Sequence, residues 1–162
     1  MSKKYQVLIL CLAYFLLLSG ESFSMIKTLP VAELVSHSDY IVIGEVQKIE
    51  VDGTDSSKMG KIKLLRNEII VKESLKGAWP LDKPMIFRTI KAERWIEDNV
   101  EFPFPGTQVV LFIKKGKSDS LNPVNGIQGL WPIQDGKLLR MGTGKTIEEI
   151  RAIIRSQTDS RK

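Results

Sequence analysis

The chain of 162 residues contains one cysteine, Cys11, and one histidine, His37. Most zinc sites and most nucleophile–histidine pairs need more thiols or imidazoles than this, so both classes are excluded at the outset. Neither glycine nor proline recurs with a period, and charged residues of both signs make up 27% of the chain. Collagen-like and disordered chains are therefore excluded as well. The length fits one globular domain, for which we expect no metal and no other cofactor.

Long apolar runs are also scarce, and the most prominent one lies at the start of the chain. Val7–Leu18 is an unbroken run of 12 apolar residues behind two lysines. As a helix it would rise about 18 Å, which is short of a bilayer core of about 30 Å. Ser22 and Ser24 are small residues at the spacing of a cleavage site. We expect residues 1–24 to be a signal peptide cleaved after Ser24; an uncleaved N-terminal anchor is the alternative.

Export has consequences for the mature chain, which we expect to be periplasmic or extracellular. Removal of residues 1–24 leaves 138 residues with a net charge of +4, no cysteine and no further transmembrane segment. An exported protein without thiols cannot be held together by disulfides, so its stability must come from a packed core. We expect a single domain over residues 25–155 and a disordered tail over 156–162.

The mature chain reads as strands between two helices. Alternating or continuous apolar runs rich in β-branched residues predict five or six strands, and Asp135-Gly136 predicts a hairpin turn. Thr146 and Glu149 form a capping box ahead of an apolar stripe, which predicts the second helix. The expected helices cover 30–37 and the stretch from 146 to 155; the expected strands cover 40–51, 62–75, 84–90, 107–113, 124–133 and 138–141.

This order of elements predicts a mainly β, α+β domain. Gly44 inside the first strand predicts a bulge, and a change in apolar phase between Leu64 and Ile69 predicts another in the second strand. Such breaks favour a small curved barrel over a sandwich. We expect residues 52–60 to be a polar loop and both Trp79 and Trp131 to be structural.

Several patterns in this order resemble a known group. They include the run from Ile41 to Val46, Glu73-Ser74-Leu75-Lys76-Gly77, Phe104-Pro105-Gly106 ahead of a buried strand, and Gln128-Gly129 ahead of Trp131. Together they resemble small exported bacterial proteins similar to the netrin and tissue-inhibitor-of-metalloproteinase type of OB-like barrel. The resemblance implies an OB-like barrel over most of residues 31–154. In those inhibitors a first cysteine chelates the target's zinc, whereas the predicted first residue here is Met25, so that chemistry is not carried over.

The segment 91–106 is the best candidate for a binding site. Arg94, Trp95, Phe102 and Phe104 place aromatic rings and a cation in an expected surface loop. Binding residues often lie on the loops of a rigid scaffold, and Trp and Arg often contribute much of the binding energy of interfaces. The alternative is that these rings cap an open end of the barrel as part of the core. The partner would be an unknown protein or an envelope polymer, bound by a non-enzymatic module of the cell envelope.

An alternative function is an envelope hydrolase that uses the carboxylates of the same segment, Glu93, Glu97, Asp98 and Glu101. Paired carboxylates can hydrolyse glycosides when they are held at defined separations, but this spacing does not bring them together. No catalytic constellation is evident, so we expect no enzyme.

Three other patterns have structural explanations. The run 142–146 imitates the end of a phosphate-binding loop, but Leu139 stands where that motif needs glycine. A single His37 lacks partners for catalysis or zinc, and Asp52 and Asp55 lack the remaining ligands of a calcium loop. The isoelectric point is near 9.3, but the basic residues are scattered along the sequence, so no nucleic acid is expected as a partner.

Overall fold

The computed structural model describes residues 27–57, 60–92 and 99–159. The expected signal peptide 1–24 with its cleavage after Ser24 lies outside these residues. So do two of the candidate binding residues, Arg94 and Trp95, and three of the candidate carboxylates, Glu93, Glu97 and Asp98.

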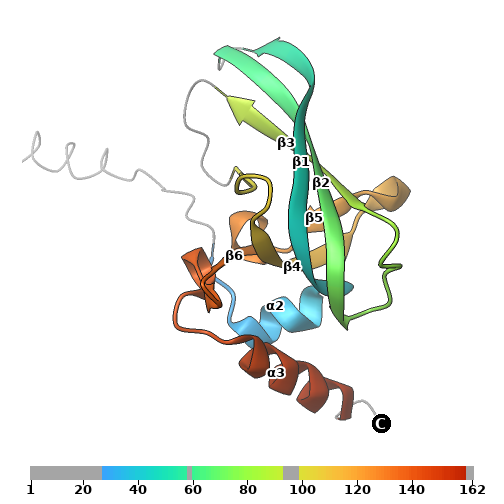
Figure 1. Ribbon diagram of the computed structural model, residues 1–162, viewed down its shortest axis with the longest axis vertical. Helices are drawn as coiled ribbons and strands as arrows, with labels where there is room; N and C mark the ends of the chain where they lie inside the picture. Colours follow the sequence, from blue (N-terminus) through green and yellow to red (C-terminus); the bar gives the residue numbers. More distant parts are fainter. Residues whose placement is uncertain (1–26, 58–59, 93–98, 160–162) are drawn as a thin grey trace, which may run out of the picture.

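The described residues form one antiparallel sheet with a helix near each end of the chain (Figure 1). The strands follow the order β3-β2-β1-β4-β6-β7, with β5 beside β4. The strands are β1 (Tyr40–Ser57), β2 (Gly60–Lys76), β3 (Met85–Ala92), β4 (Gln108–Lys115), β5 (Leu121–Pro123), β6 (Leu130–Gln134) and β7 (Lys137–Leu138). The helices are α2 (Val31–His37) and α3 (Ile147–Asp159), with single 3-10 turns at η1 (Lys117–Asp119), η2 (Gly126–Gly129) and η3 (Arg140–Gly142).

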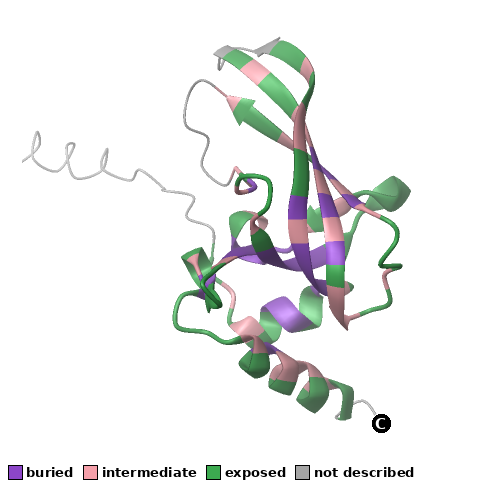
Figure 2. Ribbon diagram, viewed as in Figure 1, coloured by how far each residue is buried: buried purple, intermediate pink, exposed green. Residues whose placement is uncertain are grey.

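The core consists of two apolar clusters because β1 and β4 are buried on both faces. In β4 five consecutive residues, Val109–Ile113, are buried, which explains their unbroken apolar run. The cluster enclosed by the curved sheet comprises Val42, Val46, Ile69, Val71, Met85, Phe87, Phe102, Val109, Leu111, Ile113 and Leu130. The cluster beneath the two helices comprises Leu34, Val35, Ile41, Ile43, Val110, Phe112, Val124, Trp131, Leu138 and Ile150 (Figure 2).

The expected mainly β, α+β class with helices near both ends is confirmed, but the sheet is not closed into the expected small barrel. Residues of β3 and β5 approach each other, yet no hydrogen-bonded register joins them, so the described sheet remains open. Closure requires strand edges long enough to exchange a ladder of backbone bonds. Strand β5 has three residues, and Pro123 at its end has no N–H to donate. The described sheet has seven strands where five or six were expected.

The first hairpin is longer than expected. Residues 52–57, expected in a polar loop, continue β1, and Thr54 pairs with Lys63 in β2. The pairing is irregular at Gly44 as expected, but the extra residue is Lys72 of β2, because Ile43 pairs with Glu73 and Gly44 with Val71. The bulge expected between Leu64 and Ile69 of β2 is absent from its continuous register with β3; opposite this stretch the extra residues lie in β1, after Val46 and Val51. Leu64 is simply on the outer face, which explains the apparent change of phase.

The strand expected over 124–133 begins only at Leu130. Asn125 and Gly126 have left-handed backbone angles (φ 53° and 60°), which end the extended run. Gln128 Nε2 donates to the carbonyl of Leu29 at 2.6 Å, and Gln128 Oε1 accepts from the N–H of Leu29 at 2.9 Å. Because this buried side chain satisfies backbone groups 99 positions earlier, the local chain forms the turn η2 in place of a strand.

The sequence predicted the start of α3 correctly but not its end. The capping box is confirmed: Thr146 N donates to Glu149 Oε2 at 2.8 Å, and Glu149 N donates to Thr146 Oγ1 at 3.1 Å. Residues 156–159, expected in a disordered tail, form the last turn of the helix. Gln157 Nε2 donates to the carbonyl of Ala32 in α2 at 2.8 Å, which fastens this turn to the domain. No described helix has the length and apolar character needed to cross a membrane.

Candidate functional site

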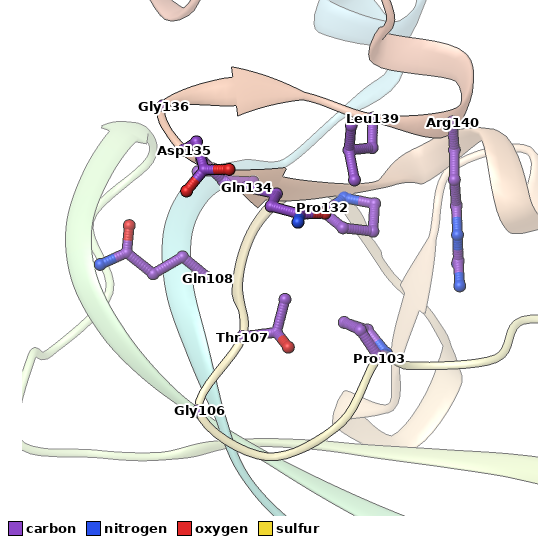
Figure 3. A pocket seen from close by; sticks show the side chains of 11 residues that line it. Pro103, Gly106, Thr107, Gln108, Pro132, Gln134, Asp135, Gly136, Leu139 and Arg140 are labelled. Carbon is purple, nitrogen blue, oxygen red and sulfur yellow. The ribbon is translucent and has the colours of Figure 1, made fainter.

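A hollow lies where the segment before β4 faces the β6–β7 hairpin (Figure 3). Its volume is about 640 Å³. One wall is formed by residues of the 103–108 segment, and the other by residues between Pro132 and Arg140. We call this hollow the hairpin groove. It lies beside the end of the segment that the sequence singled out for binding.

A tight turn shapes the first wall of the groove. Thr107 N donates to the carbonyl of Phe104 at 3.1 Å, with Pro105 and Gly106 between them. Proline followed by a residue of positive φ (89° at Gly106) is the arrangement of a type II turn. The turn is fastened to β1 by two further bonds, because Gly106 N donates to Val46 O at 2.7 Å and Val46 N donates to Thr107 O at 3.0 Å. The position of the turn is therefore set by the sheet.

The two phenylalanines of this segment have opposite environments. Phe102 is 5% exposed and packs in the enclosed core cluster, with its ring centroid 5.2 Å from that of Phe87. Phe104, two positions later, is 86% exposed on the fastened turn. Residues two positions apart in a regular strand would share a face, so the difference reflects the irregular path of the chain into the turn at Pro105-Gly106. The alternative interpretation, that rings of this segment belong to the core, describes Phe102, whereas Phe104 is available to a partner.

Charged side chains mark the two ends of the groove. Figure 3 shows Asp135 and Arg140 on opposite sides of the labelled set, with Pro132 and Leu139 between them. Asp135 and Gly136 both have positive φ (50° and 72°), as a type I′ hairpin turn requires, so the hairpin signal in the sequence is confirmed. The lining between these two charges is mixed: Pro103, Pro132 and Leu139 lie toward Arg140, and Thr107, Gln108 and Gln134 add polar groups.

Of the candidate carboxylates, Glu101 is the one that the structure describes. Its carboxylate lies 3.4 Å from Lys91 Nζ on the surface. Within the ranges 27–57, 60–92 and 99–159 no three His, Cys, Asp or Glu side chains gather in a way that could hold a metal ion. Asp135 is the acidic residue that lines the groove, and a lone carboxylate does not form the pair that glycoside hydrolysis needs.

The remaining sequence candidates have structural roles. Trp131 is buried and donates from Nε1 to the carbonyl of Gln128 at 2.7 Å. Trp79 packs at the edge of the enclosed cluster, edge-on to Tyr40 at a centroid distance of 5.4 Å. In the run that imitates a phosphate loop, a Cβ on Gly142 would lie 2.8 Å from the Trp131 ring, so this glycine serves packing. His37 is exposed at the end of α2.

Sequence reasoning missed the second wall of the groove and its cation, Arg140. Residues 138–141 were expected to be a strand, but the strand ends at Leu138 and the chain turns back through η3. No local pattern marks Arg140, because the groove arises only when the hairpin faces a segment some 30 positions earlier. No model of a known protein family matches the chain, and no curated protein matches its sequence.

Proposed function

We propose that this protein is an exported, non-enzymatic binding or accessory module of the cell envelope, which engages a protein or an envelope polymer at the hairpin groove and Phe104. The observation that carries the proposal is the exposure of a phenylalanine ring on a turn that three backbone hydrogen bonds hold beside the hairpin groove. Exposed apolar rings beside a concavity are typical of interaction sites.

The energetics support binding over a purely structural role. Burial of a phenylalanine side chain contributes roughly 1.5–3 kcal/mol, and Phe104 leaves most of that contribution unused in the isolated domain. Since the turn is already fixed by its bonds to Val46, a partner would not have to order it. Low ordering cost is what allows a small contact area to give useful affinity.

The resemblance to netrin-type and inhibitor-type domains supports the same proposal. An OB-fold is a partly open Greek-key barrel that binds ligands through its face and loops. We propose that this chain is an OB-like domain of that kind, whose β3–β5 side remains unclosed. The groove and Phe104 belong to the segments that connect its strands.

The proposed site is tested by comparing two exposed apolar residues. The C-terminally tagged full chain is produced in its own cells, cross-linked, and recovered as wild type, Phe104→Ala and Leu81→Ala. Leu81 is 56% exposed in the β2–β3 connection and serves as the matched control. We expect a partner that is retained by wild type and Leu81→Ala but lost from Phe104→Ala, and that binds again when both components are purified. Identical recovery by all three proteins would refute the proposal.

Export is tested separately. The tagged chain should be found outside the cytoplasm, and sequencing of its first residues should begin at Met25. Recovery of the full-length chain from the cytoplasm would contradict this part of the proposal.

A further inference from the structure

We propose that Arg140 is the selecting residue of the hairpin groove and that it binds a carboxylate of an extended acidic peptide. This inference rests on the proposed function and adds the chemistry of the partner. It is carried by three observations: the backbone of Arg140 is strained, its charge is unpaired within the described part of the chain, and the part of the groove next to it is lined by apolar side chains.

Arg140 has a left-handed backbone conformation, with φ of 55°. Few residues other than glycine, asparagine and aspartate adopt this conformation, because the Cβ crowds the following peptide. The surroundings hold it in place: its carbonyl accepts from Thr143 N at 3.1 Å and from Thr143 Oγ1 at 2.8 Å. Strain that a structure maintains in this way is concentrated at functional sites. A glycine or asparagine would satisfy the backbone better, so the arginine side chain calls for another explanation.

The guanidinium is only partly used by the fold. Nη1 donates to the carbonyl of Glu101 at 2.9 Å, which ties the hairpin to the segment that leads to Phe104. Among the described residues no carboxylate forms an ion pair with Arg140, and the carboxylate of Glu101 lies against Lys91 instead. Guanidinium groups have five donors in a planar fork that matches a carboxylate with two parallel bonds. The charge is therefore available to a carboxylate of a partner.

The shape of the groove favours a peptide over a polysaccharide. The part next to Arg140 is lined by Pro103, Pro132 and Leu139, which suit an apolar side chain better than a hydroxylated sugar. Arg140, beside this lining, is a residue type that is enriched in protein–protein hot spots. Asp135 at the opposite end repels acids, so the charges also set the direction of the peptide: its acidic residue lies at the Arg140 end.

The probe is a phage-displayed library of random linear peptides selected on the full chain. Enriched sequences should carry Asp or Glu next to an apolar residue. A synthetic peptide of the enriched sequence is then measured by fluorescence anisotropy against wild type, Arg140→Asn and Arg155→Gln. Arg155 is exposed on α3, so its substitution removes the same charge at a distance from the groove. We expect Arg140→Asn to weaken binding about tenfold or more, as loss of a charged hydrogen-bonded contact does, and Arg155→Gln to leave it unchanged.

Two controls separate recognition from structure. Arg140→Asn should melt close to wild type, because the better fit of asparagine to the left-handed conformation offsets the loss of the exposed hydrogen bond to the Glu101 carbonyl. On the wild-type protein, replacement of the peptide's acid by its amide should weaken binding by the same factor, and the two changes together should cost little more than either alone. This second measurement holds even if the protein variant is unstable.

The outcomes distinguish this inference from the proposed function. Enriched peptides that need Phe104 but bind Arg140→Asn as well as wild type would overturn the role of Arg140 and leave the binding module intact. Binding of an anionic glycan array through Arg140, with no peptide enriched, would overturn the peptide assignment. Failure of wild type to bind either library would count against both proposals.

Discussion

Phe102 and Phe104 lie two positions apart, and truncation of each to alanine should have opposite effects on the protein. Phe102 is buried against Phe87 in the enclosed core cluster, with 5.2 Å between ring centroids. Loss of a buried phenylalanine ring costs about 3–5 kcal/mol, which includes the cavity that remains. For Phe104, which is 86% exposed, little packing is lost, and the change in the free energy of unfolding should stay within about 0.5 kcal/mol.

Urea unfolding followed by tryptophan fluorescence measures both effects. Trp131 is buried in the cluster beneath the helices and reports on global unfolding. With a denaturant slope of about 2 kcal/mol per molar, Phe102→Ala should lower the midpoint by about 2 M, and Phe104→Ala should leave it nearly unchanged. Binding should show the reverse order, because only Phe104 lies on the proposed contact surface.

The pair also tests the reasoning behind the candidate site. If Phe104→Ala destabilised the protein as much as Phe102→Ala, the Phe104 ring would be buried in the folded protein, and the proposed contact surface would not exist. If Phe102→Ala cost less than about 1 kcal/mol, the enclosed cluster would not depend on the segment before β4, and the geometry of the groove wall would be in doubt.

Three further substitutions or measurements test the fold. Thr146→Ala removes the acceptor of the Glu149 N–H and should cost about 1 kcal/mol in urea unfolding, whereas Thr146→Asp should cost much less; equal losses would argue against the cap. Gly77→Ala places a Cβ 2.5 Å from a backbone carbonyl oxygen at a position with φ of 71°, and should lower stability by roughly 1–3 kcal/mol; an unchanged melting temperature would contradict this geometry. The hydrogen bond from Lys115 lowers the pKa of Asp119 below 3.8, so the pair should stabilise the fold above that pH and lose its effect as pH falls through the lowered value. Carboxyl NMR titration should find the Asp119 pKa below 3.8 and rising with salt; a value at or above 3.8 would refute the pairing.

Much of the local structure could be predicted because the interactions that specify it are local. The capping box at Thr146 and the hairpin turn at Asp135-Gly136 each depend on a few neighbouring residues. The unbroken apolar run of β4 indicated burial on both faces, and the structure places it between two clusters. These features follow from backbone geometry and side-chain period, which the amino-acid order contains in full.

The candidate site was only half predictable for the same reason. The aromatic residues of the 91–106 segment stood out in the sequence, but composition could not say that Phe102 turns inward and Phe104 outward. The other wall of the groove was assigned to a strand, because nothing near Arg140 shows that its backbone is left-handed. Its conformation depends on Thr143 and on the packing of the following turn against Trp131.

The amino-acid order by itself determined where the chain extends, where it coils and which faces are apolar, since those properties depend on residues a few positions apart. Only the tertiary structure decided which strand edges pair and which distant groups form hydrogen bonds. Gln128 converts an apparent strand into a turn by bonding to Leu29, and the short β5 leaves the sheet open opposite β3. In both cases the outcome depends on which groups far apart in the chain come close enough to form hydrogen bonds, and the fold alone decides that.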